Sequence, residues 1–183
     1  MAVGGVAIAS PWRRVAAWML DYLVIVAYLM LLTAASIVTS SSPTGSVFSF
    51  ALERPITAEL VGFLTLTGPV ILYFALTEAS AWQATLGKRA VRIVVVGQDG
   101  IRLPLGRAIF REVVRFLPWE MAHALIWPLA LPPHQEPLPV TIGGFAAVYL
   151  LLFAYLVSLF VGSQHRTLYD RVAGSRVVRS YAG

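Results

Sequence analysis

Four ionisable side chains lie within, or at the ends of, the long apolar segments of this 183-residue chain. An ionised group in hydrocarbon must be paired, hydrogen-bonded or protonated, because its burial without compensation is strongly unfavourable. Carboxylates and an imidazole in such a setting can take up a proton or a monovalent cation. The candidates for an ion or proton pathway are therefore Asp21, Glu78, Glu120 and His123.

Asp21 is the candidate within the first apolar segment, and two interpretations of it remain open. It lies seven residues after Arg14, so the two side chains share a helix face about 10.5 Å apart along the axis. In the functional interpretation, Asp21 binds the transported ion or proton. In the structural interpretation, it forms a salt bridge that fixes helix packing, with Arg14, Arg111 or Arg115 as its partner.

The other three candidates also allow two interpretations. Glu120 and His123 are three residues apart, so they share a helix face. If they meet Asp21 and Glu78 at one depth, the four groups form an inward-facing ion site. Taken singly, each is an interfacial residue that reaches toward water or toward an arginine.

Composition places the chain in a membrane. It is 58% hydrophobic and 13% charged, with a mean hydropathy of +0.75, whereas a soluble domain is about 45–50% apolar and roughly 25% charged. These values exclude a cytosolic enzyme, a secreted module and a disordered chain. The expected fold class is all-α integral membrane, with residues 1–183 forming a single domain.

Four apolar segments are candidates for crossing the bilayer, for which about 20 residues suffice. Residues 15–38, 60–79 and 141–161 form three of them. The remaining span, residues 118–131, is short for a full crossing unless the helix before it feeds into it, and is expected to run obliquely; a re-entrant segment is the alternative. In the second span, Pro69 predicts a kink and not a break.

The segment between the second and third spans is too basic to enter hydrocarbon. Residues 90–105 join a β-branched run to a turn signal and predict a cytoplasmic β-hairpin. Residues 105–119 place arginines at i, i+4 and i+8, which predicts a basic amphipathic helix at the membrane interface. In the cytoplasmic tail, residues 162–183, the β-branched pair Val177 and Val178 predicts a strand that adds to the hairpin in a small sheet.

The basic residues also predict the orientation of the chain. With four spans, Arg54 is the only one of the 14 basic residues that lies on the side opposite to both termini. The positive-inside rule then places the N- and C-termini in the cytoplasm. Because this rule accounts for the positive charge, we expect anionic lipid head groups of the bilayer as partners, and no nucleic acid.

Three pieces of the chain carry a family resemblance. They are WRRVAAWMLD at 12–21, ATLGKRAVRIVV at 84–95 and RTLYDRVAGSRVV at 166–178. In order and spacing they resemble the RDD family of small bacterial membrane proteins, named for one arginine and two aspartates. The resemblance implies that Arg14, Asp21 and Asp170 are the family residues. It further implies a multi-pass protein of the bacterial plasma (inner) membrane with a role in transport, for which cation/proton exchange has been proposed in some members.

The second piece contains a Gly-Lys pair that is also found in phosphate loops. That interpretation fails because Trp82 stands where the loop requires glycine, and Arg89 where it requires serine or threonine. We expect Gly87 to form a tight turn, with Lys88 and Arg89 near anionic head groups.

In the third piece, the spacing of Thr167 and Asp170 predicts a short capped helix that ends at Gly174. Asp170 then anchors the basic cytoplasmic region, or it takes part in ion entry or coupling.

Nothing in the sequence indicates covalent chemistry. The chain has no cysteine, no arrangement of serine, histidine and acid for nucleophilic catalysis, and no recognised metal-ligand spacing. We therefore expect no enzyme, no cofactor and no metal. Two function classes remain. One is a small transporter that exchanges a monovalent cation for a proton, as a homo-oligomer because four helices enclose little volume. The other is an accessory or scaffold subunit of a larger membrane complex.

Overall fold

The computed structural model describes residues 2–3, 6–39, 54–131 and 137–180. This part of the chain is mostly helical. The long helical elements are α1 (Pro11–Thr39), α3 (Pro55–Gly62), η1 (Phe63–Thr67), α4 (Gly68–Ala79), α6 (Leu105–Ala130) and α7 (Leu138–Phe160). The short elements are the helices α5 (Leu86–Ala90) and α8 (Leu168–Val172) and the strands β1 (Ala2–Val3), β2 (Val6–Ala7), β3 (Ile93–Gly97) and β4 (Ser175–Arg179).

Three stretches of helix are long and apolar enough to cross a membrane: Pro11–Thr39, Pro55–Ala79 and Leu138–Phe160. They contain the predicted spans 15–38 and 60–79 and all but the last residue of the predicted span 141–161. In the most apolar 18-residue stretch of each helix, 0% of the residues are buried in Pro11–Thr39, 33% in Pro55–Ala79 and 11% in Leu138–Phe160. Apolar helices with so little protein around them need lipid or further protein to cover them.

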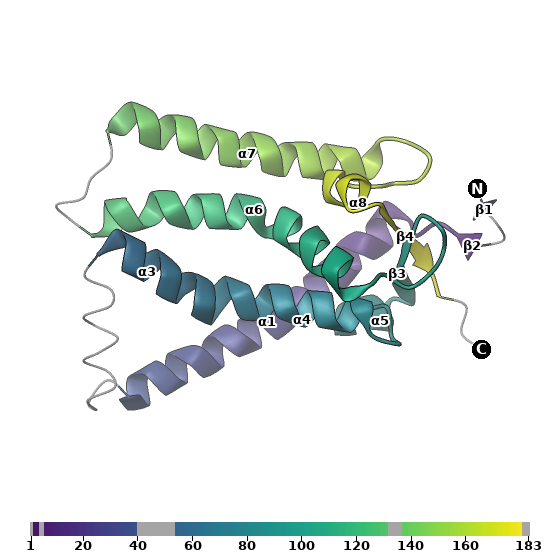
Figure 1. The fold of residues 1–183 in the computed structure, drawn as a ribbon, viewed down its shortest axis with the longest axis horizontal. Helices are drawn as coiled ribbons and strands as arrows, with labels where there is room; N and C mark the ends of the chain where they lie inside the picture. The colour runs from purple at the N-terminus through teal and green to yellow at the C-terminus, as the bar shows by residue number, and fades with distance from the viewer. Residues whose placement is uncertain (1, 4–5, 40–53, 132–136, 181–183) are drawn as a thin grey trace.

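Helix α6 combines two elements that the sequence predicts separately. The interfacial helix 105–119 and the span 118–131 form one continuous helix, with Pro118 inside it. This helix is not among the three spans that length and composition support, because its first half is charged. Figure 1 shows α6 lying between α7 and the α3–η1–α4 segment, with α1 tilted away from α7.

The second apolar helix continues past Pro69, as predicted, through a change in helical geometry. Residues Phe63–Thr67 form a π-helical segment directly before Gly68. A Cβ on Gly68 would lie 2.9 Å from the carbonyl oxygen of Phe63, so this turn requires glycine. π-Segments and prolines are the usual places where a long helix bends.

The small sheet is built differently from the predicted hairpin. β3 pairs with β4 in antiparallel register, from Ile93 opposite Arg179 to Gly97 opposite Ser175. The prediction that the tail adds a strand is confirmed, but the hairpin 90–105 is wrong. Residues 101–105 form no second strand, and Ile101 instead closes the local turn by accepting a hydrogen bond from the backbone N–H of Gly97 at 2.8 Å. The nonlocal partner is favoured because it buries Val95 against Val177.

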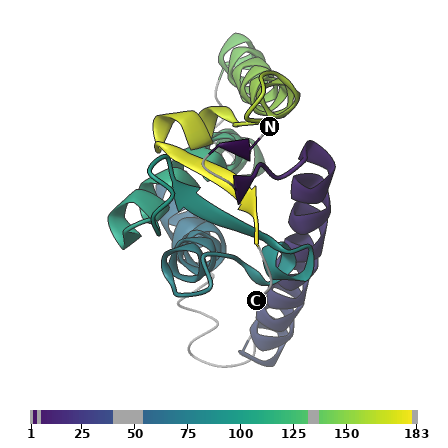
Figure 2. The same cartoon turned by 90° about the vertical axis from the view of Figure 1, so that its right-hand side faces the viewer.

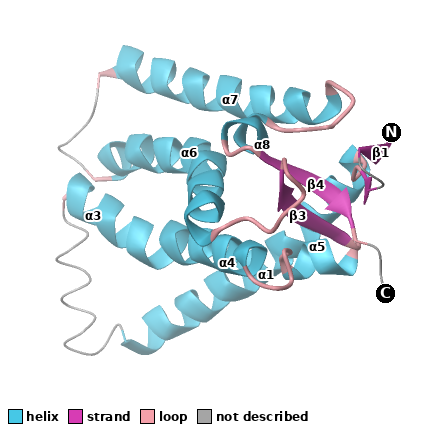
Figure 3. Ribbon diagram, turned by 45° about the vertical axis from the view of Figure 1, so that its right-hand side comes forward, coloured by secondary structure: helices cyan, strands magenta, loops and turns pink. Residues whose placement is uncertain are grey.

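The short elements gather at one end of the molecule, which we call the sheet end: α5, β3, α8 and β4. Figures 1 and 3 show these elements and the first residues of α6 together there, with both ends of the described chain. Figure 2 looks onto this end and shows the sheet between α1 on one side and α7 on another. β1 pairs with β2, and Ile8 bridges to Val178.

Candidate functional site

Arg111 lies at the centre of a charged network at the sheet end. Its side chain is 1% exposed. The guanidinium contacts three carboxylates: Nη1 donates to Glu78 Oε2 at 2.8 Å and to Glu112, and Nη2 donates to Asp170 Oδ1 at 2.7 Å. Nε donates to Ser175 Oγ at 3.2 Å. One side chain thus joins α4, α6, α8 and β4.

Asp170 connects this centre to the start of α1. Its Oδ2 accepts a hydrogen bond from Arg14 Nη2 at 2.5 Å, and it also accepts from Thr167 Oγ1 at 2.7 Å. Thr167 and Asp170 form the predicted capping box of α8, and Gly174 follows with φ +62°. Burial acts to raise the pKa of the Asp170 carboxyl, but the charges of Arg14 and Arg111 outweigh it and hold that pKa well below its usual range.

Two more basic side chains complete the network. Lys88 Nζ on α5 donates to Glu78 Oε1 at 2.7 Å. Arg115, one turn after Arg111, donates from Nη1 to Glu112 Oε2 at 3.1 Å and lies 4.3 Å from the centre of the Phe74 ring. All three acids of the network are fully buried and therefore out of contact with bulk solvent.

Asp21 is held by neutral donors. Its carboxylate, in a residue 1% exposed, accepts from Thr85 Oγ1 at 2.5 Å, from the backbone N–H of Gly87 at 2.8 Å and from Tyr73 Oη at 3.3 Å. Three donors thus occupy its two oxygens. Thr85 and Gly87 tie α1 to the start of α5, and Tyr73 ties it to α4.

The predicted salt bridge of Asp21 is therefore wrong. Among the described residues it has no ion pair with Arg14, Arg111 or Arg115. Arg14 pairs with Asp170 instead, and its guanidinium also donates to the carbonyl oxygen of His165 at 2.5 Å. The three residues that the family resemblance points to are thus divided between two contacts: Arg14 with Asp170, and Asp21 with the N-terminus of α5.

Gly87 and Lys88 do not form the predicted lipid-facing turn, because Lys88 is buried and points to Glu78. Arg89 is exposed and lies 4.2 Å from the centre of the Trp82 ring, so its contact with head groups stays a prediction. Gly87 is within helix α5, where a Cβ would lie 2.3 Å from the carbonyl oxygen of Ala17. Glycine is required here because α5 packs directly on α1.

The first half of α6 is also not a helix that presents its arginines to head groups. Arg107 Nη2 donates to the carbonyl oxygens of Ala173 at 3.0 Å and Gly174 at 2.6 Å. Arg111 and Arg115 also face the protein. The arginines at i, i+4 and i+8 form the stripe that holds α8 and β4, and the opposite face is apolar.

Glu120 and His123 form a separate group further along α6. His123 Nδ1 lies 3.6 Å from Glu120 Oε1, and Glu59 of α3 interacts with both. The candidates thus do not converge: Asp21 and Glu78 both contact α5, whereas Glu120 and His123 face α3.

Sequence reasoning missed Glu112, Thr85 and Glu59 as members of these groups. Glu112 could have been found as the one acid in an arginine-rich segment, and Thr85 by its position before a helix start.

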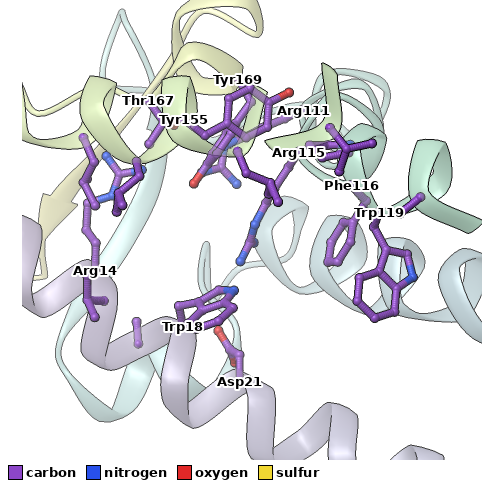
Figure 4. Close-up of a pocket in the computed structure, with 18 of the residues that line it drawn as sticks. Arg14, Trp18, Asp21, Arg111, Arg115, Phe116, Trp119, Tyr155, Thr167 and Tyr169 are labelled. Atoms are coloured by element: carbon purple, nitrogen blue, oxygen red, sulfur yellow. The ribbon is translucent and has the colours of Figure 1, made fainter. Parts of the chain in front are cut away.

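A cavity of about 640 Å³ lies between α1, α6 and α7. Its sheet end is lined by Arg14, Asp21, Lys88, Arg111 and Arg115, and its walls by apolar and aromatic side chains. Figure 4 shows Arg14, Trp18 and Asp21 of α1 on one side and Arg111, Arg115 and Trp119 of α6 across from them. The lining therefore contains four basic side chains and one acidic one.

These features define a helical membrane protein with a buried ionic network at one end of its helices. The chain belongs to the RDD family, whose sequence model matches residues 8–174. This confirms the resemblance drawn from the sequence. Comparison with curated proteins and with solved structures finds no match.

Proposed function

We propose that this RDD protein has a transport-related function and binds its solute through an anionic group, in the cavity between α1, α6 and α7. The observation that carries the proposal is the lining of that cavity: four basic side chains against the single acid Asp21. Ionisable groups that face a cavity inside a membrane protein generally mark a solute pathway. Binding, and not covalent conversion, is the proposed activity.

Arg115 carries free donors, beside Lys88, whose Nζ makes one hydrogen bond, to Glu78. Nη1 of Arg115 is bound to Glu112, but its Nε and Nη2 make no hydrogen bond within the described parts of the chain. The acids that balance these cations, Glu78, Glu112 and Asp170, are not in the cavity lining. An anion in the cavity would therefore meet the donors first.

We further propose that α6 is the fourth span, in a multi-pass protein of the inner membrane with both termini in the cytoplasm. Its 26 residues extend about 39 Å at 1.5 Å per residue, enough for a crossing. It packs against α4 and α7. The charged first half would lie at the cytoplasmic interface, which agrees with the positive-inside rule.

Cation/proton exchange is the second transport candidate. Glu78 is paired with Lys88 and Arg111, and the oxygens of Asp21 are occupied by donors. The observation that favours this candidate is Glu120 with His123 and Glu59, since no basic side chain is paired with these acids in the described residues apart from the histidine itself.

The accessory-subunit alternative rests on α1. None of the residues in the most apolar window of α1 is buried. A larger membrane complex, or a second copy of this chain in a homo-oligomer, would cover that surface.

The experiment is current measurement from proteoliposomes on a solid-supported membrane. Concentration jumps of sodium octanoate and sodium glycerol phosphate test anions, and jumps of sodium and potassium chloride test cations. Ala122→Trp blocks the cavity, which Ala122 lines, and Ala124→Trp is the control because Ala124 is exposed on the same helix and outside the lining.

We expect anion currents that Ala122→Trp abolishes and Ala124→Trp leaves intact. Currents on cation jumps alone, lost in Glu120→Gln and retained in Ala122→Trp, would replace the proposal with cation exchange. A silent protein that purifies from its membrane with a stoichiometric partner would make the chain an accessory subunit.

A further inference from the structure

The lining of the cavity changes from charged to apolar along its length. The lining residues of α6 run from Arg111 to Ile126, and those of α7 from Leu159 back to Phe145. At 1.5 Å per residue these stripes are about 21–22 Å long. One leaflet of the hydrocarbon core is roughly 15 Å thick. The cavity is therefore charged at the sheet end, and its apolar lining on α6, from Phe116 to Ile126, extends about 15 Å, the thickness of one leaflet.

The apolar part of the cavity is open on its side. Lining residues on all three helices keep large exposed fractions, among them Trp18 (49%), Trp119 (53%), Leu156 (55%) and Tyr149 (68%). Buried lining of a closed chamber would not be exposed in this way.

The opening lies between α1 and α7. Helix α1 packs chiefly against α5 and has few contacts with α6 or α7. Near the sheet end the two helices meet through the rings of Trp12 and Phe160, 5.7 Å apart. Away from that contact they diverge (Figure 1). A ligand would thus enter from the membrane and would be stopped at the charged end.

These features exclude a small hydrophilic anion as the best fit, since it would leave most of the cavity wall without a partner. The free Nε and Nη2 of Arg115 fit a phosphate group, with Lys88 and Arg14 also in the lining. A hydrocarbon chain fits the exposed stripes on α6 and α7.

We propose that the cavity binds one anionic phospholipid from the membrane, with the phosphate beside Arg115 and an acyl chain along the lining residues of α6 and α7. This rests on the proposed function in that the same cavity is the ligand site, and it names the class of ligand. Asp21 faces the same space but is already held by Thr85 and Gly87.

The test is native mass spectrometry of the delipidated full-length protein. It is titrated with phosphatidylglycerol or with phosphatidylcholine of identical chains, and glycerol phosphate is the competitor without a chain. Arg115→Gln removes the guanidinium group and its charge, and Arg102→Gln is its charge-matched control, because Arg102 is exposed and outside the lining. Ala122→Trp fills the apolar part, and Ala124→Trp is its control.

We expect one phosphatidylglycerol per chain, at least about tenfold tighter than phosphatidylcholine. Arg115→Gln should remove this preference, and Ala122→Trp should weaken both lipids, whereas the two controls match the wild type. Thermal unfolding of each variant identifies any variant that has lost its fold. Arg115→Lys keeps the positive charge and should therefore retain part of the preference for phosphatidylglycerol.

Equal retention of both lipids would overturn the proposal, and so would retention that Ala122→Trp does not change. Displacement by glycerol phosphate at comparable concentration would show a site for the head group alone and would overturn it too. The experiments distinguish failure of the lipid site from failure of the transport proposal. Selective lipid binding without any current would support the lipid site and contradict transport. Anion currents that Ala122→Trp blocks, without lipid selectivity, would support transport and contradict the lipid site.

Discussion

The guanidinium of Arg14 and the carboxylate of Asp170 lie 2.5 Å apart, although 156 residues separate them in the chain. The arginine lies in the first turn of α1, and the aspartate is in the capping box of α8. Both side chains are buried. The first long helix is therefore fixed to the last short one by a single ion pair.

Removing one partner of this pair should be costly. Asp170→Asn leaves Arg14 and Arg111 without their shared carboxylate, and breaking a buried pair from one side destabilises by about 3–5 kcal/mol. Arg14→Gln removes one of the two cations and should cost less. Thermal unfolding in detergent compares the stabilities of the two variants, with Arg102→Gln as the exposed control. A smaller loss of stability in Asp170→Asn than in Arg14→Gln would contradict the prediction.

The same residue predicts a pH dependence. Because the pKa of Asp170 is lower in the folded protein than in the unfolded chain, its stabilisation is present above the unfolded pKa, about 3.9 for Asp. It is lost as the pH falls from there through the folded pKa. Between pH 5 and pH 3 the wild-type melting temperature should therefore fall more steeply than that of Asp170→Asn. If the melting temperatures of the two proteins fall in parallel, Asp170 does not contribute to the pH dependence of stability.

Gly87→Ala should separate α5 from α1. A Cβ at this position would lie 2.3 Å from the backbone oxygen of Ala17 and 2.8 Å from Asp21 Cγ. Backbone has to shift, and overpacking of this kind costs about 1–3 kcal/mol. Gly106→Ala is the matched control, because nothing lies within 4 Å of its Cβ. It should be neutral or slightly stabilising, and equal losses in the two variants would count against direct packing.

The hydroxyl of Thr85 gives a finer test of the Asp21 contact. Thr85→Val keeps the shape and removes the donor to Asp21 Oδ2, so a buried carboxylate oxygen loses its partner at a cost of about 1–3 kcal/mol. Thr85→Ser restores the donor and should recover most of the stability. If valine and serine destabilise equally, the methyl group and not the hydrogen bond holds the two helices.

Spans and caps were predictable because they depend on neighbouring residues. The uncharged run of residues 141–161 falls on α7, and the spacing of Thr167 and Asp170 gives the capping box that the structure contains. The turn at residues 97–100 also forms, with Gly100 at φ +83°. The tail strand was predicted too, but the local sequence suggested residues 101–105 as the direct partner of β3, whereas the partner is β4, about 80 residues later.

The ionic network was not predictable for the same reason. The periodicity of Arg107, Arg111 and Arg115 marks a helix face, but does not say whether that face meets lipid or protein. The partners come from α4 and α8, and Glu112 lies beside Arg111 in the sequence. Asp21 was recognised as buried, yet two of its three donors, Thr85 and Gly87, belong to a segment that sequence reasoning assigned to a turn.

Because Arg14 and Asp170 are far apart in the sequence, the ribosome synthesises them at clearly different times. At roughly 5–20 residues per second, the aspartate is made about 8–30 s after the arginine. Until then the arginine exists without its final partner, and β3 exists without β4. The first helix can therefore pack against α5 before the ionic partner of Arg14 is made. Chains that stop short of residue 170 would still contain the helices α1, α3, α4, α6 and α7 and the contact of Asp21 with α5, but would lack the ion pair that joins Arg14 to α8.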